Sequence, residues 1–405
     1  MSQHETFQIG IARGEITPPV GATMVGYNAR TSTEVGHSLR AEVMVCRDPS
    51  RGWVLVASDT IGYTRDYARK IREAIAEATG IPADAVILSG THTHSGPCTI
   101  LFGRGENLAP LDQEYLASLP AKLAEIAGEA SRNASPGFFA STWTEAPEFA
   151  HNRRAQREDG TWINVWQDPE GQCKGFYDPA ILLVAVCRPD GRREALLVNY
   201  GCHPVVLGPN SLDLTADYVG YLKDQLEADG AAETVLFTLA ACGNINPRNC
   251  ILTGTEAPKA AGETLAAIIM DALDQLQPLA GGVVGHARTD WEFPRTREVL
   301  KRKDRGESQR IGDPIQTEVS AVRAGALGLL AVPGELFSEF NETVRESSPT
   351  PVTLVVTMAN DYIGYIPTDQ AQEEGAYETT MAPAEGMEKP FLEAVGRAYT
   401  GLVTP

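Results

Sequence analysis

Apolar positions in the first quarter of the chain fall into short runs separated by one amphipathic segment. The segment "TRDYARKIREAIAEATG" repeats apolar residues at Tyr67, Ile71 and Ile75, which is helical spacing, and Gly80 stands where a helix C-cap belongs. Apolar runs of strand length lie on both sides of it, and they end on polar or glycine-rich residues. This strand–helix–strand order predicts a βαβ unit. The runs are 41–48, 53–59 and 85–90.

The same alternation continues to the end of the chain. Segments 180–188 and 194–204 are apolar and flank "PDGR", which predicts two strands joined by a turn. Polar and aromatic residues without periodicity fill 150–180, which is typical of a long functional loop. The pattern predicts a mixed α/β fold with mixed sheets flanked by helices. Further helices are expected at 112–133 (kinked at Pro120), 217–230, 256–276 and 336–347, and further strands at 234–240 and 351–360.

Composition narrows the class of protein. The chain has 405 residues, 43% of them hydrophobic, and a formal net charge of −19. A charge of this sign argues against nucleic acid and anionic membranes as partners, because binding phosphates requires excess lysine and arginine. The basic stretch 295–315 therefore reads as a solvated loop. No signal peptide precedes the first strand, and no apolar run reaches the length of a membrane span.

The seven cysteines are scattered without C-x-x-C spacing, which suits reduced thiols. Cys242 and Cys250 are the closest pair, and a bridge between them is the less favoured alternative. Together with the missing signal peptide, the cysteines predict a cytoplasmic protein without stable membrane association.

Histidine and carboxylate side chains follow three of the apolar runs. His92 and His94 in "LSGTHTHSGP" are two positions apart, so in an extended segment they point to the same side. His203 follows the strand 194–204, and Glu335 follows a proline–glycine turn. Two histidines and a glutamate form a ligand set of catalytic zinc sites, although hydrogen-bonded loop histidines and a helix-capping Glu335 explain the same residues.

"GTHTHSGP" resembles the signature of the neutral/alkaline, non-lysosomal ceramidases, which are zinc-dependent amide hydrolases. The resemblance implies one neutral-ceramidase-like catalytic domain over 1–405, without the C-terminal immunoglobulin-like domain of that family, and one Zn²⁺ per chain. It is carried in order by further blocks, namely "EITPPVG…MVGY", "NRR", "NYGCHP", "GNINPRN", "VPGE" and "NDYIGYIPT…GAYE".

The resemblance also implies roles for individual residues. The zinc ligands correspond to His92, His203, Glu335 and Tyr365, and Tyr362 is the rival for the tyrosine. Phenolate is an uncommon ligand, because its pKa near 10 requires the metal to stabilise the ionised form.

The family's substrate-facing side chains correspond to His94, Arg153 and Tyr377, and these three are the expected catalytic residues. His94 could protonate the leaving amine, and any of the three could stabilise the oxyanion. Arg154 stands beside Arg153 and could exchange roles with it in binding substrate. Among other acidic residues at element ends, Asp59 is a candidate to orient a ligand histidine, and Asp217 reads as a helix N-cap.

The chain departs from the family in "GNINPRN", where Asn244 and Asn246 replace an aspartate and a serine. Asn246 can still hydrogen-bond substrate. We therefore expect a zinc-dependent hydrolase that uses metal-activated water on an amide bond of a small soluble substrate rather than ceramide. A zinc esterase or lactonase, a true ceramidase and a non-catalytic metal-stabilised ligand-binding protein are the alternatives. The sequence leaves a homo-oligomer open.

Overall fold

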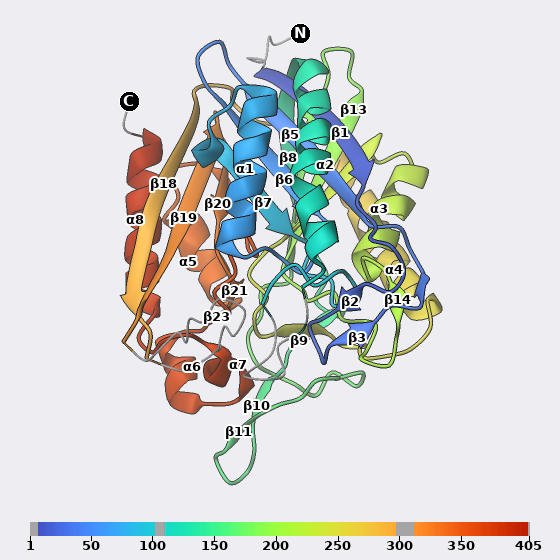
Figure 1. Cartoon of the computed structure of the whole chain (residues 1–405), viewed down its shortest axis with the longest axis vertical. Helices are drawn as coiled ribbons and strands as arrows, with labels where there is room; N and C mark the ends of the chain where they lie inside the picture. The colour runs from blue at the N-terminus through green and yellow to red at the C-terminus, as the bar shows by residue number, and fades with distance from the viewer. Residues whose placement is uncertain (1–6, 102–108, 110, 297–311, 404–405) are drawn as a thin grey trace.

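Two sheets of different size organise the chain (Figure 1). The computed structural model describes residues 7–101, 109, 111–296 and 312–403. Most of the basic stretch predicted as a solvated loop, 297–311, lies outside these residues. The mixed α/β class expected from the sequence is confirmed.

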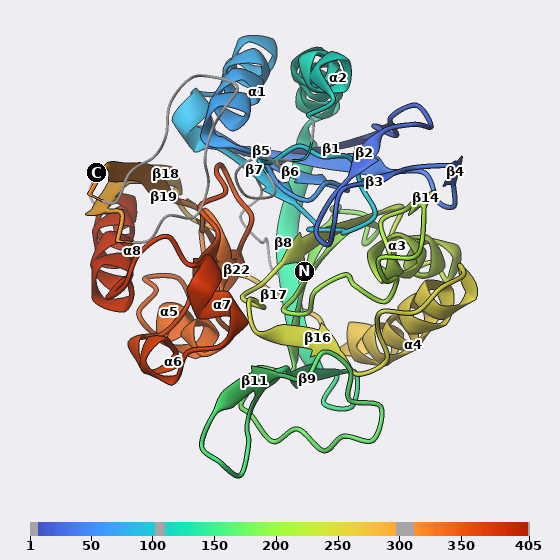
Figure 2. The same cartoon turned by 60° about the horizontal axis from the view of Figure 1, so that its bottom comes forward.

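The larger sheet has nine strands within the described ranges, in the order β15-β13-β12-β8-β1-β5-β6-β7, with β17 paired to β8. Helices α1 (Arg65–Thr79) and α2 (Gln113–Arg132) lie side by side against the part of the sheet formed by β1, β5 and β7. Helices α3 (Tyr218–Ala228) and α4 (Glu256–Ala272) pack against β15 and β8 (Figure 2). Its strands are β1 Phe7–Glu15, β5 Arg40–Arg47, β6 Gly52–Ser58, β7 Val86–Gly90, β8 Ser135–Glu145, β12 Ala180–Cys187, β13 Arg193–Tyr200, β15 Thr234–Leu239 and β17 Gln277–Pro278.

The smaller sheet has the order β18-β19-β20-β22 and carries α8 against β18 and β19. Its strands are β18 Val284–Pro294, β19 Pro314–Ala324, β20 Leu327–Ala331 and β22 Val352–Val356. The helices are α1 Arg65–Thr79, α2 Gln113–Arg132, α3 Tyr218–Ala228, α4 Glu256–Ala272, α5 Phe340–Glu346, α6 Asp369–Glu374, α7 Tyr377–Met381 and α8 Glu388–Val403.

The predicted βαβ unit is present as β6–α1–β7. Strands β6 and β7 are parallel, and every residue of both is buried, which explains why they read as continuous apolar runs. Gly80 ends α1 in the left-handed conformation at φ 73°, and its N–H bonds the carbonyl of Ala76. The predicted strand pair β12–β13 is antiparallel as expected. Helix α2 runs through Pro120.

The remaining short strands form two-stranded pairs outside the two larger sheets. In the aperiodic segment 150–180, β10 and β11 form a hairpin and β9 pairs with β16 (Figure 2). The segment expected to be a functional loop is therefore fixed to the strand that carries Asn246. The short strands are β2 Thr23–Met24, β3 Arg30–Thr31, β4 Glu34–Val35, β9 Ala150–Asn152, β10 Arg154–Gln156, β11 Trp162–Asn164, β14 Asp213–Leu214, β16 Ile245–Pro247, β21 Glu335–Leu336 and β23 Tyr365–Ile366.

All seven cysteines are free, so Cys242 and Cys250 form no bridge. Among the described residues, no helix combines the length and the apolar character needed to cross a bilayer. The N-cap prediction for Asp217 is confirmed, because its carboxylate accepts the N–H of Tyr218 at the start of α3.

A buried ion cluster joins α3 to the larger sheet. The ammonium of Lys223 lies 3.0 Å from both oxygens of Glu42 and 2.9 Å from Oδ1 of Asp59, and all three side chains are fully buried. Burial raises the pKa of Glu42 to about 7, although Lys223 acts to lower it. The expectation that Asp59 orients a ligand histidine is wrong, because its carboxylate is used by Lys223 and by the N–H of Arg40.

The substitution Lys223→Met should destabilise the fold by about 3–5 kcal/mol, because it removes the ammonium between two buried carboxylates and leaves Arg40 as the cation beside Glu42. Urea unfolding of the variant and the wild type measures the difference. Lys122→Met, at an exposed position of α2, is the matched control and should change the free energy of unfolding little. Equal effects of the two substitutions would contradict the role given to the cluster.

Candidate metal centre and its cavity

Two histidines that follow strands are oriented by backbone carbonyl groups. Nδ1 of His92 lies 2.8 Å from the carbonyl oxygen of Ile61, and Nδ1 of His203 lies 2.9 Å from that of Ile245. A carbonyl oxygen can only accept, so each ring donates its Nδ1–H and keeps the lone pair on Nε2. His92 adopts a left-handed backbone conformation, φ 66°, which is uncommon for a residue other than glycine.

The free ring nitrogens converge with a carboxylate. Oε2 of Glu335 lies 3.0 Å from Nε2 of His203 and 3.5 Å from Nε2 of His92. His94 joins them, with its Nε2 3.4 Å from Nε2 of His92. The ligand atoms of the three histidines lie within 4.8 Å of one another, and all four side chains are buried. This donor set of neutral imidazoles and one carboxylate fits a divalent metal such as zinc.

The protonation states of these groups also suit a metal. Burial raises the pKa of the Glu335 carboxyl, but the imidazoles of His92 and His203 lower it more, and the net shift is well below its ordinary value. Burial lowers the pKa of His203, and burial together with the two neighbouring imidazoles lowers that of His94. For His94, His203 and Glu335, these pKa shifts favour the neutral imidazole and the ionised carboxylate that metal binding requires.

The two candidate tyrosines have different partners. The hydroxyl of Tyr362 donates to Oε1 of Glu335 at 2.8 Å. Tyr365 is the register partner of Glu335 in the parallel pair β21–β23, and its hydroxyl accepts from Nη2 of Arg153 at 3.1 Å. Both tyrosines therefore lie beside Glu335, and the choice of Tyr365 as a ligand stays a prediction.

A cavity of about 300 Å³ lies next to the metal centre. His94 lines it and also contacts His92, so His94 connects the two. Tyr377, half exposed, reaches the same space, and so do Trp166 and Tyr27. Its lining combines polar groups with apolar side chains. The other lining residues are Gly26, Arg153, Asn246, Tyr365, Val205, Pro209 and Ile251.

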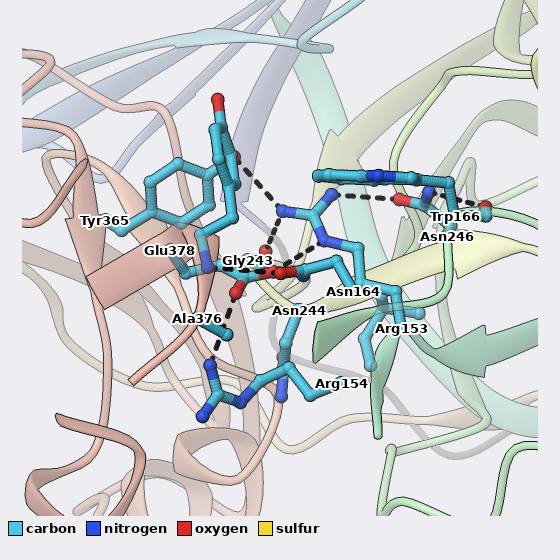
Figure 3. A network of polar contacts seen from close by, with 12 residues as sticks. Arg153, Arg154, Asn164, Trp166, Gly243, Asn244, Asn246, Tyr365, Ala376 and Glu378 are labelled. Carbon is cyan, nitrogen blue, oxygen red and sulfur yellow. Dashed lines mark hydrogen bonds and ion pairs between the residues drawn. The ribbon is translucent and has the colours of Figure 1, made fainter. Parts of the chain in front are cut away.

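Arg153 is the centre of a polar network at the cavity wall (Figure 3). Its Nε donates to Oε1 of Glu378 at 2.7 Å, and its Nη1 donates to Oδ1 of Asn246 at 3.0 Å. Its Nη2 donates to the carbonyl of Gly243 at 2.8 Å as well as to Tyr365. The ring of Trp166 lies 5.0 Å from the guanidinium carbon. Arg153 thus has a fixed orientation, which a substrate-facing group needs.

Arg154 shares Glu378 with Arg153, but its other partners differ (Figure 3). It donates to the carbonyl oxygens of Gly375 and Ala371 and to the carboxylates of Glu374 and Glu378. It does not line the cavity. This geometry gives Arg154 the task of holding the segment around α6 and α7, and it does not favour the substrate-binding role that the sequence suggested.

Asn246 lies at the cavity, as expected, but both ends of its amide are used. Its Oδ1 accepts from Arg153, and its Nδ2 donates to the carbonyl of Trp166 at 3.0 Å. Asn244 is further away and bonds Glu339 and the N–H of Ser338. The amide of Asn246 therefore orients Arg153.

Sequence reasoning missed Glu378. This fully buried carboxylate accepts from both arginines and from Nδ2 of Asn164 at 2.6 Å. Asn164 also accepts the N–H of Tyr377, and Ala376 just before it has a strained backbone, φ 78°. The only local signal is the position of Glu378 directly after Tyr377.

The contacts that hold His94 in place were also not predicted from the sequence. Arg30 donates to the main-chain carbonyl of His94 and to those of Gly208 and Ser211. The ring of Tyr27 meets that of His94 edge-on at 4.9 Å. Gly26 has φ 105°, and a Cβ there would lie 2.3 Å from Cγ of His94, so the block "MVGY" needs its glycine.

Comparison with known proteins identifies the architecture. No protein-family model matches the chain. Neutral ceramidase from Pseudomonas aeruginosa superposes with a TM-score of 0.79 over 99% of this chain and 75% of that chain, at 14% identity. A ceramidase complexed with C2 gives a TM-score of 0.80 over 99% of this chain and 77% of that chain, also at 14% identity. The chain has the fold of the neutral ceramidases. The neutral-ceramidase-like fold expected from the sequence blocks is thereby confirmed.

In this neutral-ceramidase fold, Glu378→Ala should destabilise the protein by about 3–5 kcal/mol, because the buried guanidinium of Arg153 loses its carboxylate and that of Arg154 keeps Glu374 alone. Glu378→Gln keeps an acceptor oxygen and should cost less. Urea unfolding measures both. Glu373→Ala, exposed on the neighbouring helix α6, is the control, and an equal effect of the two alanine substitutions would refute the role of Glu378.

Proposed function

We propose that this protein is a zinc-dependent hydrolase that cleaves an amide bond in a small soluble substrate. The observation that carries the proposal is the convergence of His92, His203 and Glu335, with both Nδ1–H groups held by backbone carbonyls, beside a cavity that His94 lines. The neutral-ceramidase fold supports hydrolysis, and the sequence resemblance to zinc-dependent amide hydrolases supports the bond type and the metal.

When bound, zinc lowers the pKa of a water molecule and polarises a carbonyl oxygen. Water adds to the amide carbon, the C–N bond breaks, and a carboxylic acid and an amine leave. His94 is buried and neutral between the donor set and the cavity, so it is placed to take a proton from the water and deliver it to the leaving nitrogen.

The oxyanion needs donors with a fixed position. We assign this task to Tyr377 and Arg153, which line the same cavity as His94. Glu378 accepts a hydrogen bond from Nε of Arg153 and so fixes the guanidinium. Tyr377 precedes Glu378 and is the first residue of the same helix, α7.

The size of the cavity supports a small substrate. At about 300 Å³ it lies at the lower end of ligand pockets, which span about 300–1,000 Å³. The apolar side chains Val205, Pro209 and Ile251 fit a short acyl group, and the tyrosines and His94 fit the polar reacting centre. The seven free cysteines support the further proposal of a reducing, cytoplasmic location.

Protein purified without chelator should contain about one zinc per chain, and His92→Ala and Glu335→Ala should each lose most of it. Metal analysis of the purified variants measures this, and circular dichroism checks that they fold. His286→Ala, on strand β18 and outside the group, should keep its zinc. Folded wild-type protein that takes up no zinc would refute the proposal.

Short acyl amides should be hydrolysed faster than long-chain ones, because the cavity accepts only a short group. The measurement is kcat/KM for N-acetyl, N-butyryl and N-palmitoyl derivatives of one amine, with the matching esters and a lactone as a second series. A higher kcat/KM for the palmitoyl amide would favour a true ceramidase. Turnover restricted to the second series would favour an esterase or lactonase.

A further inference from the structure

The two oxygens of Glu335 face different groups. Oε2 lies 3.0 Å from Nε2 of His203 and 3.5 Å from Nε2 of His92. Oε1 accepts the hydroxyl of Tyr362 at 2.8 Å. The carboxylate is buried, so an Oε1 without this donor would be a buried acceptor without a partner, which costs about 1–3 kcal/mol.

Tyr362 is itself held in place by the surrounding fold. Its N–H donates to Oδ1 of Asp361 at 2.7 Å, and the same oxygen accepts the N–H of Arg65 at the start of α1. The other oxygen of Asp361 accepts the hydroxyl of Thr317 on β19 at 2.9 Å. The ring of Tyr362 lies 6.4 Å from that of His92. Buried contacts to two elements thus fix the phenol against Glu335.

We propose that Tyr362 is a positioning residue that occupies Oε1 of Glu335 and leaves Oε2 as the one oxygen available to the metal. The inference rests on the proposed zinc site. A carboxylate that binds through both oxygens fills two coordination positions, whereas a catalytic zinc needs one position open for water. A hydrogen bond to the second oxygen prevents the first arrangement and fixes the rotamer of the carboxylate.

The same contacts separate the two tyrosines that the sequence could not distinguish. The hydroxyl of Tyr362 is bound to the carboxylate, whereas the hydroxyl of Tyr365 faces the guanidinium of Arg153 at the cavity. Tyr362 is therefore the hydrogen-bond partner of Glu335, and a tyrosine ligand, where the site has one, is Tyr365.

The test uses the full chain stripped of metal and titrated with Zn²⁺ against a chromophoric chelator. Tyr362→Phe should keep one zinc per chain but bind it about 10–100-fold more weakly, because loss of an outer partner of a ligand typically has this effect. Tyr399→Phe is the control: it removes another buried hydroxyl, bonded to the carbonyl of Val344, and should leave the affinity unchanged.

A second readout separates positioning from general loss of structure. In the Co²⁺-substituted protein, the d–d absorption weakens as the coordination number rises. Tyr362→Phe frees Oε1 to bind, so its cobalt spectrum should be weaker than that of the wild type, and the Tyr399→Phe spectrum should match the wild type. Unchanged zinc affinity, or weaker affinity with an unchanged cobalt spectrum, overturns the proposal.

Ferric ion tests the rival in which Tyr362 is itself a ligand, because a bound phenolate gives a visible charge-transfer band. A band lost in Tyr362→Phe and kept in Tyr365→Phe overturns the proposal, and the reverse pattern supports it. Failure of the proposed function looks different: the wild type then binds no zinc, whereas failure of the inference alone leaves wild-type binding intact.

Discussion

The candidate centre depends on two hydrogen bonds from imidazole to main chain. Those from His92 to the carbonyl of Ile61 and from His203 to that of Ile245 decide which nitrogen of each ring carries a proton and where the other one points. Backbone carbonyls belong to the sheet and its connections, so they cannot rotate away as a side-chain partner can. The rings are thus oriented before any ligand arrives, and binding needs little reordering.

The sequence predicted the parts of the site that depend on local pattern. His92, His203 and Glu335 each follow an apolar strand or a tight turn, and loops at strand ends are where α/β proteins gather ligands. The βαβ unit and the cap at Gly80 follow from spacing alone. The sequence motifs shared in order with the neutral ceramidases predicted the fold of the whole chain, although its identity to the superposed structure is only 14%.

The parts that could not be predicted depend on contacts across long stretches of chain. Glu378 is 225 residues away from Arg153 in sequence, and nothing local shows that they meet. Arg153 and Arg154 are neighbours, yet one faces the cavity and the other faces α6 and α7, because successive residues of an extended segment point to opposite sides. Asp59 directly follows strand β6, a position that suggested a partner for a ligand histidine. The group that binds it is instead the ammonium of Lys223 on α3.

The pairing of β9 with β16 separates two properties of the molecule. The candidate donor atoms belong to residues that follow strands and turns of the fold, whereas Arg153 and Trp166 of the cavity lining belong to segment 150–180, which pairs with β16 through β9. Insertions or substitutions in segment 150–180 therefore change the shape and polarity of the cavity while the candidate donor atoms stay in place. The fold can therefore vary this part of the cavity lining without altering the candidate donor set.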